Sequence, residues 1–352
     1  MKKPILSALF GLYLLPTPTT AQILLPESVT NNAVAVARVG KSTIAYSFYG
    51  LGSGKEWSDV HTKAFAVNLT SGAARRIANV PDSLGRLAAS ASTIRNRIFI
   101  TGGYAVFANG KELSSSHLFI FDPQTETYTQ GAALPHAIDD HVQAVWRDSL
   151  LYVVSGWSDS LTVAGVQVYV PSENRWREAT PVPNERDAKV FGGAGVIVRD
   201  TIFYLGGAVF EKSYPPARTL YKGVINASNP SEISWKAVAT FPGEYRYRSA
   251  AFVSGERIVF WGGSNETYNY NGIAYANKTP VEPNRTALVF DVRTQSFSTA
   301  AISPRKRVMD IRNIIRISDK PQRSEWAIVG GMQHGQKVSR NVVIIEVGDI
   351  RP

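Results

Sequence analysis

The sequence predicts an all-β protein folded as a six-bladed β-propeller. A glycine turn recurs along the chain, and each copy follows a short run rich in Val, Ile, Phe, Tyr and Trp, the residues that favour strands. The first five turns are spaced by about fifty residues, a period typical of propeller repeats. The turns lie at Gly50–Gly52, Gly102–Gly103, Ser155–Gly156, Gly206–Gly207, Gly262–Gly263 and Gly330–Gly331.

Each repeat offers up to four strands, the number in one propeller blade. A strand of small apolar residues comes first, as in AVAVARV and LAASAST, and small side chains suit an innermost strand because strands crowd together at the axis. The strand that enters the glycine turn is second, and a third follows the turn. These third strands are expected at Ala64–Leu69, His117–Asp122, Gly165–Val170, Arg218–Ile225, Ala287–Asp291 and Asn341–Val347.

An amphipathic outer strand completes five repeats, and an aromatic residue marks four of them, at Tyr128, Trp176, Trp235 and Phe297. The sixth repeat has no outer strand of its own, and Gln22–Pro26 can supply it. We therefore expect the N-terminal strand to pair with the last blade, which closes the ring and covers edges that would invite aggregation. Two stacked β-sandwiches would also give many short strands, but the regular turns favour the propeller.

Residues 1–21 have the pattern of a secretory signal. Lys2 and Lys3 precede the apolar stretch Ile5–Leu15, and Thr19-Thr20-Ala21 resembles a small-residue cleavage site. The apolar stretch is too short to span a bilayer, although a retained anchor is the alternative. We expect one propeller domain over residues 22–352, with no membrane span once the signal is removed. Because the chain has no cysteine and so no disulfide, we expect a bacterial periplasmic or secreted protein.

The formal net charge of +10 favours anionic partners in general. The basic residues are scattered, apart from Arg305-Lys306-Arg307, and no nucleic-acid motif is present, so a nucleic-acid partner is not expected. The absence of cysteine excludes a thiolate nucleophile and cysteine metal ligands. We expect neither a metal nor a cofactor.

Charged residues recur where the chain enters the innermost strands, at the mouth of the propeller. These entry loops contain Arg86, Asp139-Asp140-His141, Glu185-Arg186-Asp187, Tyr245-Arg246-Tyr247-Arg248 and Arg305–Arg307. Among them we predict that Arg86, Asp140, Arg186 and Arg246 bind substrate. The alternative is structural: a charged residue at this point can cap the strand or pair with its neighbour, because structural ion networks resemble sites.

Two loops after glycine turns depart from the repeat. Residues 264–284 insert into the fifth repeat and carry Tyr268, Tyr270 and Tyr275, whose flat faces and polar tips suit a sugar. The loop after Gly207 brings Glu211 and Arg218 close in sequence, and a carboxylate beside a cation can act as a general base while the cation holds an anion. The alternatives are a solvated loop and an ordinary surface ion pair.

The glycine doublets, the strand ending in Asp122 or Asp291, and the later Tyr or Trp resemble kelch repeats. This resemblance covers nearly the whole chain after residue 21 and implies the propeller fold. It says little about function, since propellers carry many unrelated sites.

Within that group, the two unusual loops are similar to those of the N-acetylneuraminate epimerases, which are periplasmic sialate mutarotases. The resemblance implies that Glu211 takes the proton of the anomeric hydroxyl, and that Arg218, with Arg186 or Arg246, pairs with the sugar carboxylate without a cofactor. The match has departures: Glu211 lies four residues after the glycine doublet, and the blade lengths differ. A non-enzymatic propeller that binds a glycan or a protein partner is the alternative.

Overall fold

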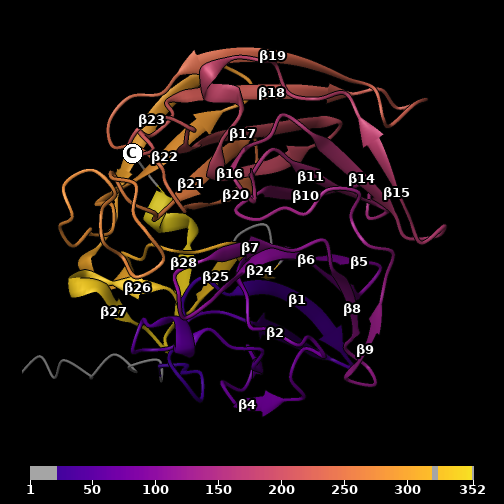
Figure 1. The fold of residues 1–352 in the computed structure, drawn as a ribbon, viewed down its shortest axis with the longest axis vertical. Helices are drawn as coiled ribbons and strands as arrows, with labels where there is room; N and C mark the ends of the chain where they lie inside the picture. Colours follow the sequence, from indigo (N-terminus) through magenta and orange to yellow (C-terminus); the bar gives the residue numbers. More distant parts are fainter. Residues whose placement is uncertain (1–21, 319–323, 351–352) are drawn as a thin grey trace, which may run out of the picture.

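The computed structural model describes residues 22–318 and 324–350. The predicted signal at residues 1–21 lies outside them. Six sheets surround a common axis, and their colours run around the ring so that the first and last blades lie side by side (Figure 1). The protein is therefore a six-bladed β-propeller, as the repeat predicts.

The strands of each blade pair in chain order from the axis outwards. Blade 1 contains β1 (Ala33–Val39), β2 (Ser42–Phe48), β3 (Ala64–Asn68) and β4 (Ala74–Ile77). Blade 2 contains β5 (Leu87–Ile94), β6 (Arg97–Val106), β8 (Leu118–Asp122) and β9 (Thr127–Gln130). Blade 3 contains β10 (Val142–Trp146), β11 (Leu150–Val154), β14 (Val166–Val170) and β15 (Arg175–Ala179).

The second half of the ring follows the same order. Blade 4 contains β16 (Phe191–Val198), β17 (Thr201–Ala208), β18 (Thr219–Ile225) and β19 (Ile233–Thr240). Blade 5 contains β20 (Ala250–Ser254), β21 (Arg257–Trp261), β22 (Thr286–Asp291) and β23 (Ser296–Ala301). Blade 6 contains β24 (Ile315–Ser318), β25 (Glu325–Val329) and β28 (Val342–Glu346).

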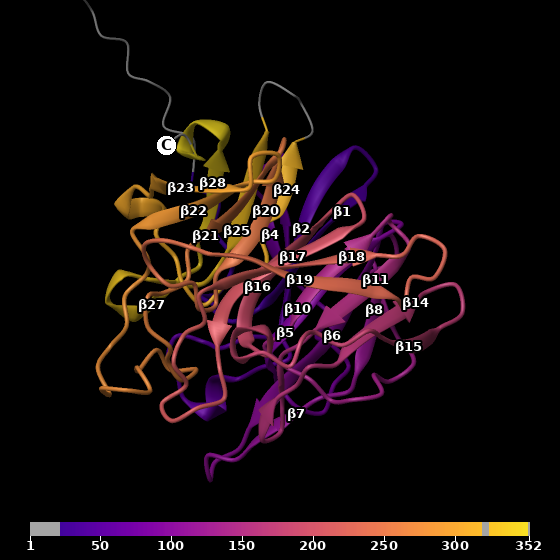
Figure 2. The ribbon, with the colours of Figure 1, turned by 90° about the horizontal axis from the view of Figure 1, so that it is seen from above.

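Short strands and 3-10 turns lie in the loops, and β7 extends blade 2 at one face of the ring (Figure 2). The short strands are β7 (Glu112–Ser114), β12 (Trp157–Ser158), β13 (Leu161–Thr162), β26 (Met332–Gln333) and β27 (Lys337–Val338). The 3-10 turns are η1 (Trp57–Asp59), η2 (Arg186–Ala188), η3 (Pro304–Lys306), η4 (His334–Gln336) and η5 (Val347–Ile350). In the described residues, no helix is both long and apolar enough to cross a bilayer.

The expected crowding of the innermost strands is visible at Gly195 on β16. A Cβ there would lie 2.6 Å from the Cγ1 of Val142 on the innermost strand of blade 3. Larger side chains fill the space between blades farther out, as where Phe121 packs edge-on against Phe48 of the preceding blade, with ring centroids 5.4 Å apart. Small residues inside and large ones outside therefore produce the wedge shape of each blade.

The glycine turns join the blades to one another. At every turn a backbone N–H donates to a carbonyl just before the innermost strand of the next blade. The six hydrogen bonds run from Gly50 to Arg86, Gly103 to Ile138, Gly156 to Val190, Gly207 to Arg246, Gly263 to Val308 and Gly331 to Val29, over 2.7–3.0 Å. The last of these connects blade 6 to blade 1, so the series closes on itself.

The outer aromatic residues join neighbouring blades at the periphery. Tyr128 donates its hydroxyl to the Ala78 carbonyl over 2.9 Å. Trp176 Nε1 donates to the Ala132 carbonyl over 2.8 Å, and Trp235 Nε1 donates to the Thr180 carbonyl over 2.9 Å. Each of these aromatics on an outer strand thus bonds to the chain that leaves the preceding blade.

The N-terminal segment pairs with the last blade, as predicted. Leu24 and Asn341 form an antiparallel bridge, Leu25 N donates to the Arg340 carbonyl over 2.7 Å, and Val342 N donates to the Ile23 carbonyl over 2.9 Å. The pairing is a single bridge with two flanking hydrogen bonds rather than a regular strand, because the segment turns inwards to reach Val29.

Gly206 tests the importance of the glycine turns. A Cβ at this residue would lie 2.1 Å from the carbonyl oxygen of Arg246, and its φ of +70° is unfavourable for any other residue. We expect Gly206→Ala to destabilise the protein by more than about 2 kcal/mol in urea unfolding. The matched control is Gly110→Ala, where φ is +78° and nothing lies within 4 Å; it should lose only about 1 kcal/mol. Equal losses would contradict the role of close approach between blades.

Candidate functional site: the axial cavity

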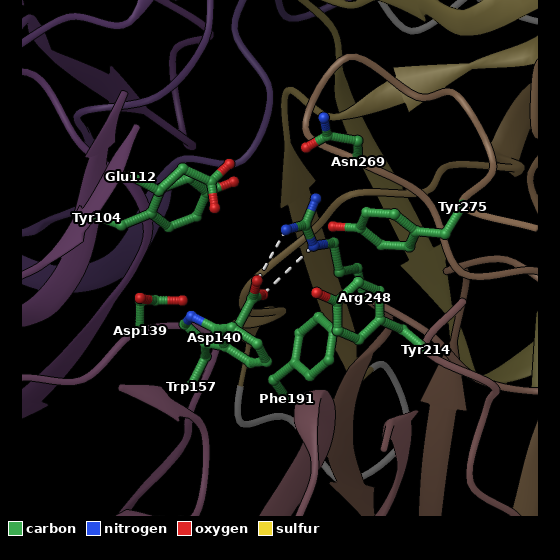
Figure 3. Close-up of a pocket in the computed structure, with 10 residues that line it drawn as sticks. All are labelled: Tyr104, Glu112, Asp139, Asp140, Trp157, Phe191, Tyr214, Arg248, Asn269 and Tyr275. Carbon is green, nitrogen blue, oxygen red and sulfur yellow. Dashed lines mark hydrogen bonds and ion pairs between the residues drawn. The ribbon is translucent and has the colours of Figure 1, made fainter. Parts of the chain in front are cut away.

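A cavity of about 160 Å³ opens beside the propeller axis, on the face that carries the glycine turns. Figure 3 shows side chains from blades 2 to 5 converging on it. Its lining combines acidic, basic and aromatic groups, namely Tyr104, Glu112, Asp139, Asp140, Trp157, Phe191, Tyr214, Arg248, Asn269 and Tyr275.

Aromatic rings form one wall of the cavity. Trp157 lies edge-on to Phe191 and to Tyr214, with centroid distances of 5.3 and 5.7 Å. Tyr214 also contacts Tyr275 at 4.8 Å. Such T-shaped contacts hold rings in fixed relative positions, so the wall is preorganised.

Trp157 is held in place by a two-residue ribbon in blade 3. It pairs with Thr162 across β12 and β13. Its backbone also forms reciprocal hydrogen bonds of 2.9 Å with Asp139, which leads into the innermost strand. The tryptophan and the carboxylate of Asp139 are therefore fixed by the same backbone bridge.

The axial floor is built from one residue of unusual backbone conformation per blade. At the entrance of each innermost strand one residue has positive φ, a conformation that only Gly, Asn and Asp adopt readily. These residues are Asn31, Ala88, Asp140, Gly192, Arg248 and Asp310. Backbone hydrogen bonds link them around the axis, for example Gly192 N to the Asp140 carbonyl (2.7 Å) and Arg248 N to the Gly192 carbonyl (2.8 Å).

Four charged side chains form a buried ion-pair network at this floor, each at most 5% exposed. Arg248 Nη2 and Nε donate to the two carboxylate oxygens of Asp140, over 2.7 and 3.3 Å. Arg312 Nη1 donates to Asp140 as well, and Arg248 Nη1 lies 3.5 Å from Asp310 Oδ1. The nitrogen of Arg248 that lies away from Asp140 in Figure 3 is therefore Nη1, the one that pairs with Asp310.

Neighbouring carboxyls at the site have opposite protonation preferences. Burial, together with the negative charge of Asp140, raises the pKa of Asp139 well above its ordinary value. Burial acts in the same direction on Asp140, but the guanidinium groups of Arg248 and Arg312 outweigh it and lower the pKa of Asp140. Asp139 therefore favours the neutral acid, whereas Asp140 favours the ionised form.

Glu112 is a third carboxyl at the cavity. The residue keeps contact with solvent, but its carboxylate faces the cavity beside Tyr104 in Figure 3, and burial there raises the pKa of Glu112. Ser114, on the same strand β7, donates a 2.6 Å hydrogen bond to Asp139 Oδ2. The β7 hairpin thus carries the carboxyl of Glu112 and, through Ser114, holds the carboxyl of Asp139.

Of the residues predicted in the entry loops, Asp140 lies in the cavity wall. Arg86 lies elsewhere, in an ion pair with Asp82 over 2.6 Å. Arg246 is fully buried beside blade 5, where its Nη2 lies 3.2 Å from Thr286 Oγ1, and burial lowers the pKa of Arg246 to about 10. Neither arginine lines the cavity, and both have structural partners.

The predicted catalytic pair is not brought together. Glu211 is exposed and accepts hydrogen bonds from Arg186 Nε and Nη2 over 2.9 and 3.2 Å. Arg218 donates instead to the carbonyls of Phe241 and Gly243, over 3.0 and 2.9 Å. None of these three predicted residues lines the cavity, so their chemical roles stay predictions.

The tyrosine-rich insertion does reach the mouth. Tyr268 is fully buried, and its hydroxyl lies 3.4 Å from Asp310 Oδ1 beneath the cavity. Tyr270 is half-buried and packs beside the same group of apolar residues. Asn269 and Tyr275, from the same insertion, line the cavity itself. The insertion therefore contributes to the mouth through Tyr275, one of its three expected tyrosines, and through Asn269.

Sequence reasoning missed Glu112, Trp157 and Phe191, whereas Asp139 and Arg248 lie in the entry loops where charged candidates were expected. Arg248 could have been chosen within its loop, because aligning the entry loops on their glycine turns places it level with Asp140 and Asp310. For Glu112 and Trp157 no such signal exists, because the loops that carry them have no counterpart in the other repeats. In the described ranges, no three His, Asp or Glu side chains are grouped so that they could hold a metal ion.

Comparisons with known proteins support this architecture. Residues 85–135 match the kelch motif. The chain is 26% identical over 229 residues to Kelch-like protein 25 of Xenopus tropicalis. The aligned region covers 62% of this chain and 35% of that protein. It is 29% identical over 133 residues to Beta-scruin of Limulus polyphemus, covering 37% and 14%. The matches thus span about a third or less of these relatives.

A solved structure titled "Structure of YjhT" superposes with a TM-score of 0.69 and covers 92% of this chain and 97% of its own. At 15% sequence identity this likeness concerns the fold. The protein is a six-bladed β-propeller that contains a kelch motif over residues 85–135 and has an axial cavity at the face of the glycine turns.

Replacing the carboxyl by an amide should change the stability of the protein in opposite directions at Asp139 and Asp140. In the folded protein the raised pKa of Asp139 keeps its carboxyl protonated to a higher pH than in the unfolded chain, where it ionises near the ordinary pKa of 3.8. Folding therefore takes up a proton above that pH, and the protein loses stability as the pH rises. Asp139→Asn removes this cost and should be more stable than the unmodified protein at pH 7. Asp140→Asn leaves Arg248 and Arg312 without their shared carboxylate and should lose about 3–5 kcal/mol.

Urea unfolding at a series of pH values checks both expectations. The gain from Asp139→Asn should shrink as the pH falls towards 3.8, where the unfolded carboxyl also becomes neutral. The loss from Asp140→Asn should shrink in acid too, because its depressed pKa stabilises the fold only above the pH at which the carboxyl protonates. A pH-independent effect of Asp139→Asn would contradict the assignment of a neutral acid.

Proposed function

We propose that the protein binds a small sugar acid of the sialate type in the axial cavity and interconverts its anomers. The observation that carries the proposal is the composition of this one cavity: a fixed aromatic wall, an arginine in the lining, and two carboxyls with raised pKa. Ligand sites typically combine apolar walls with a few polar groups of this kind.

Each part of the cavity has a role in this proposal. The apolar C–H face of a pyranose packs on the wall of Trp157 and Tyr214, because burial of both surfaces from water is favourable. Arg248 attracts the sugar carboxylate, although Asp140 neutralises part of its charge. The preference for an anion comes from Arg248 and Arg312 together, because they face one carboxyl whose pKa is lowered, Asp140, and one whose pKa is raised, Asp310.

Anomer interconversion needs one base and one acid. Glu112, whose raised pKa makes it a better base than an ordinary carboxylate, takes the proton from the anomeric hydroxyl. Asp139, a neutral acid, donates its proton to the ring oxygen as the bond between that oxygen and the anomeric carbon breaks. The reverse steps on the other face of the open carbonyl close the ring and restore both carboxyls.

A second candidate is binding of a protein partner without catalysis. It is favoured by exposed apolar side chains on loops after successive glycine turns: Trp57, Leu113, Leu161 and Phe210 are 41–54% exposed. Kelch propellers commonly bind protein partners, and a rim of this kind suits such contact.

Two variants distinguish Glu112 from Glu211 as the general base. In exchange NMR of N-acetylneuraminic acid, Glu112→Gln should slow the enzyme-catalysed conversion of the two anomers by about 10²–10⁴-fold, since Gln cannot take a proton. Glu211→Gln tests the residue predicted from sequence; the cavity mechanism requires full activity in this variant.

The possible results distinguish the cavity mechanism from chemistry at Glu211 and from binding without catalysis. Loss of activity in Glu211→Gln with activity retained in Glu112→Gln would show that the base is Glu211, in the loop after Gly207. If the unmodified protein gives no acceleration over buffer, the mutarotase is wrong and a binding function remains. Thermal unfolding of each variant shows whether a loss of activity reflects a loss of folding.

A further inference from the structure

We propose that the axial cavity continues outwards into a second subsite on Phe210, which holds the second ring of an oligosaccharide. The ring at the reducing end occupies the cavity, where its anomeric carbon meets Glu112 and Asp139. This inference rests on the proposed function and extends it from a free sugar to the end of a glycan chain.

A continuous aromatic path leads from the cavity to solvent. Tyr247 is fully buried and contacts Phe191 at 5.8 Å, and Phe191 contacts Trp157 at 5.3 Å. Trp157 then contacts Phe210 at 5.7 Å. Trp157 lines the cavity, whereas Phe210 does not and is 54% exposed. The path therefore runs from the buried ring of Tyr247, through the cavity wall, to the exposed ring of Phe210.

Phe210 is held in a well-bonded loop. Val209 N donates to the Pro215 carbonyl over 3.0 Å, and Ala217 N donates to the Gly207 carbonyl over 2.9 Å. A bridge between Ala208 and Pro216 joins the two sides of the loop. Single exposed apolar residues are common on proteins. This one differs because a fixed loop presents its ring next to a wall of the candidate site.

The size of the cavity also favours a ligand that extends beyond it. Pockets that enclose a whole drug-sized ligand measure about 300–1,000 Å³. The cavity, at about 160 Å³, is smaller, so part of a sialate and any further unit of a chain would lie outside it. The next unit of a chain therefore lies outside, and the aromatic surface adjoining the wall is that of Phe210.

The test compares the monomer of N-acetylneuraminic acid with its α2,8-linked dimer by calorimetric titration. The unmodified protein should bind the dimer about three- to tenfold more tightly, the gain expected from one aromatic contact. Phe210→Ala should bring the ratio of the two dissociation constants close to one. Trp57→Ala is the matched control, because Trp57 is 45% exposed on the mouth loop of blade 1, and it should keep the dimer preference.

The failure of this inference differs from the failure of the proposed function. Equal affinities for monomer and dimer in the unmodified protein would overturn the second subsite while leaving the sugar site intact. The same result is expected if Phe210 serves a protein partner instead. Binding of neither saccharide would overturn the proposed function, and with it this extension. Loss of the dimer preference in Trp57→Ala but not in Phe210→Ala would place the second subsite on blade 1.

Discussion

The fold depends on one repeated hydrogen bond, from the N–H of a glycine turn to the carbonyl that precedes the next innermost strand. Six such bonds run around the ring, and the last one joins blade 6 to Val29. The bond requires an approach so close that a Cβ at Gly206 would lie 2.1 Å from the acceptor oxygen. The glycines of the repeat are therefore needed for contact between blades as much as for the turn itself.

The same junction creates the candidate site. In every blade a residue with positive φ lies two positions after the carbonyl that accepts the glycine N–H. This backbone directs Asp140, Arg248 and Asp310 towards the axis, where they pair in a buried network. Their pairing fills the floor, while Ala88 and Gly192 at the equivalent positions of blades 2 and 4 have no long side chain to add. The cavity lies above this floor, bounded by loops that vary from blade to blade.

Regular and irregular parts of the chain thus have different tasks. The repeated parts, such as the glycine turns and the outer-strand aromatics, bond one blade to the next. The irregular parts carry the chemistry: the β7 hairpin brings Glu112, the β12–β13 ribbon brings Trp157, and the insertion of residues 264–284 brings Tyr275. Both carboxyls proposed to act on a sugar depend on the β7 hairpin, since Ser114 also contacts Asp139.

The sequence by itself determined the ring of six blades, the order of their strands and the segment that closes the ring. It could do so because strand propensity and glycine turns are local properties that repeat at a fixed spacing. Only the tertiary structure decided which charged residue reaches the site. Arg246 and Arg248 lie in one loop, yet Arg246 packs beside Thr286, whereas the positive φ of Arg248 directs it to Asp140. Glu211 was expected at the mouth and pairs with Arg186 outside the cavity, because the direction of a loop side chain depends on neighbouring blades that are distant in sequence.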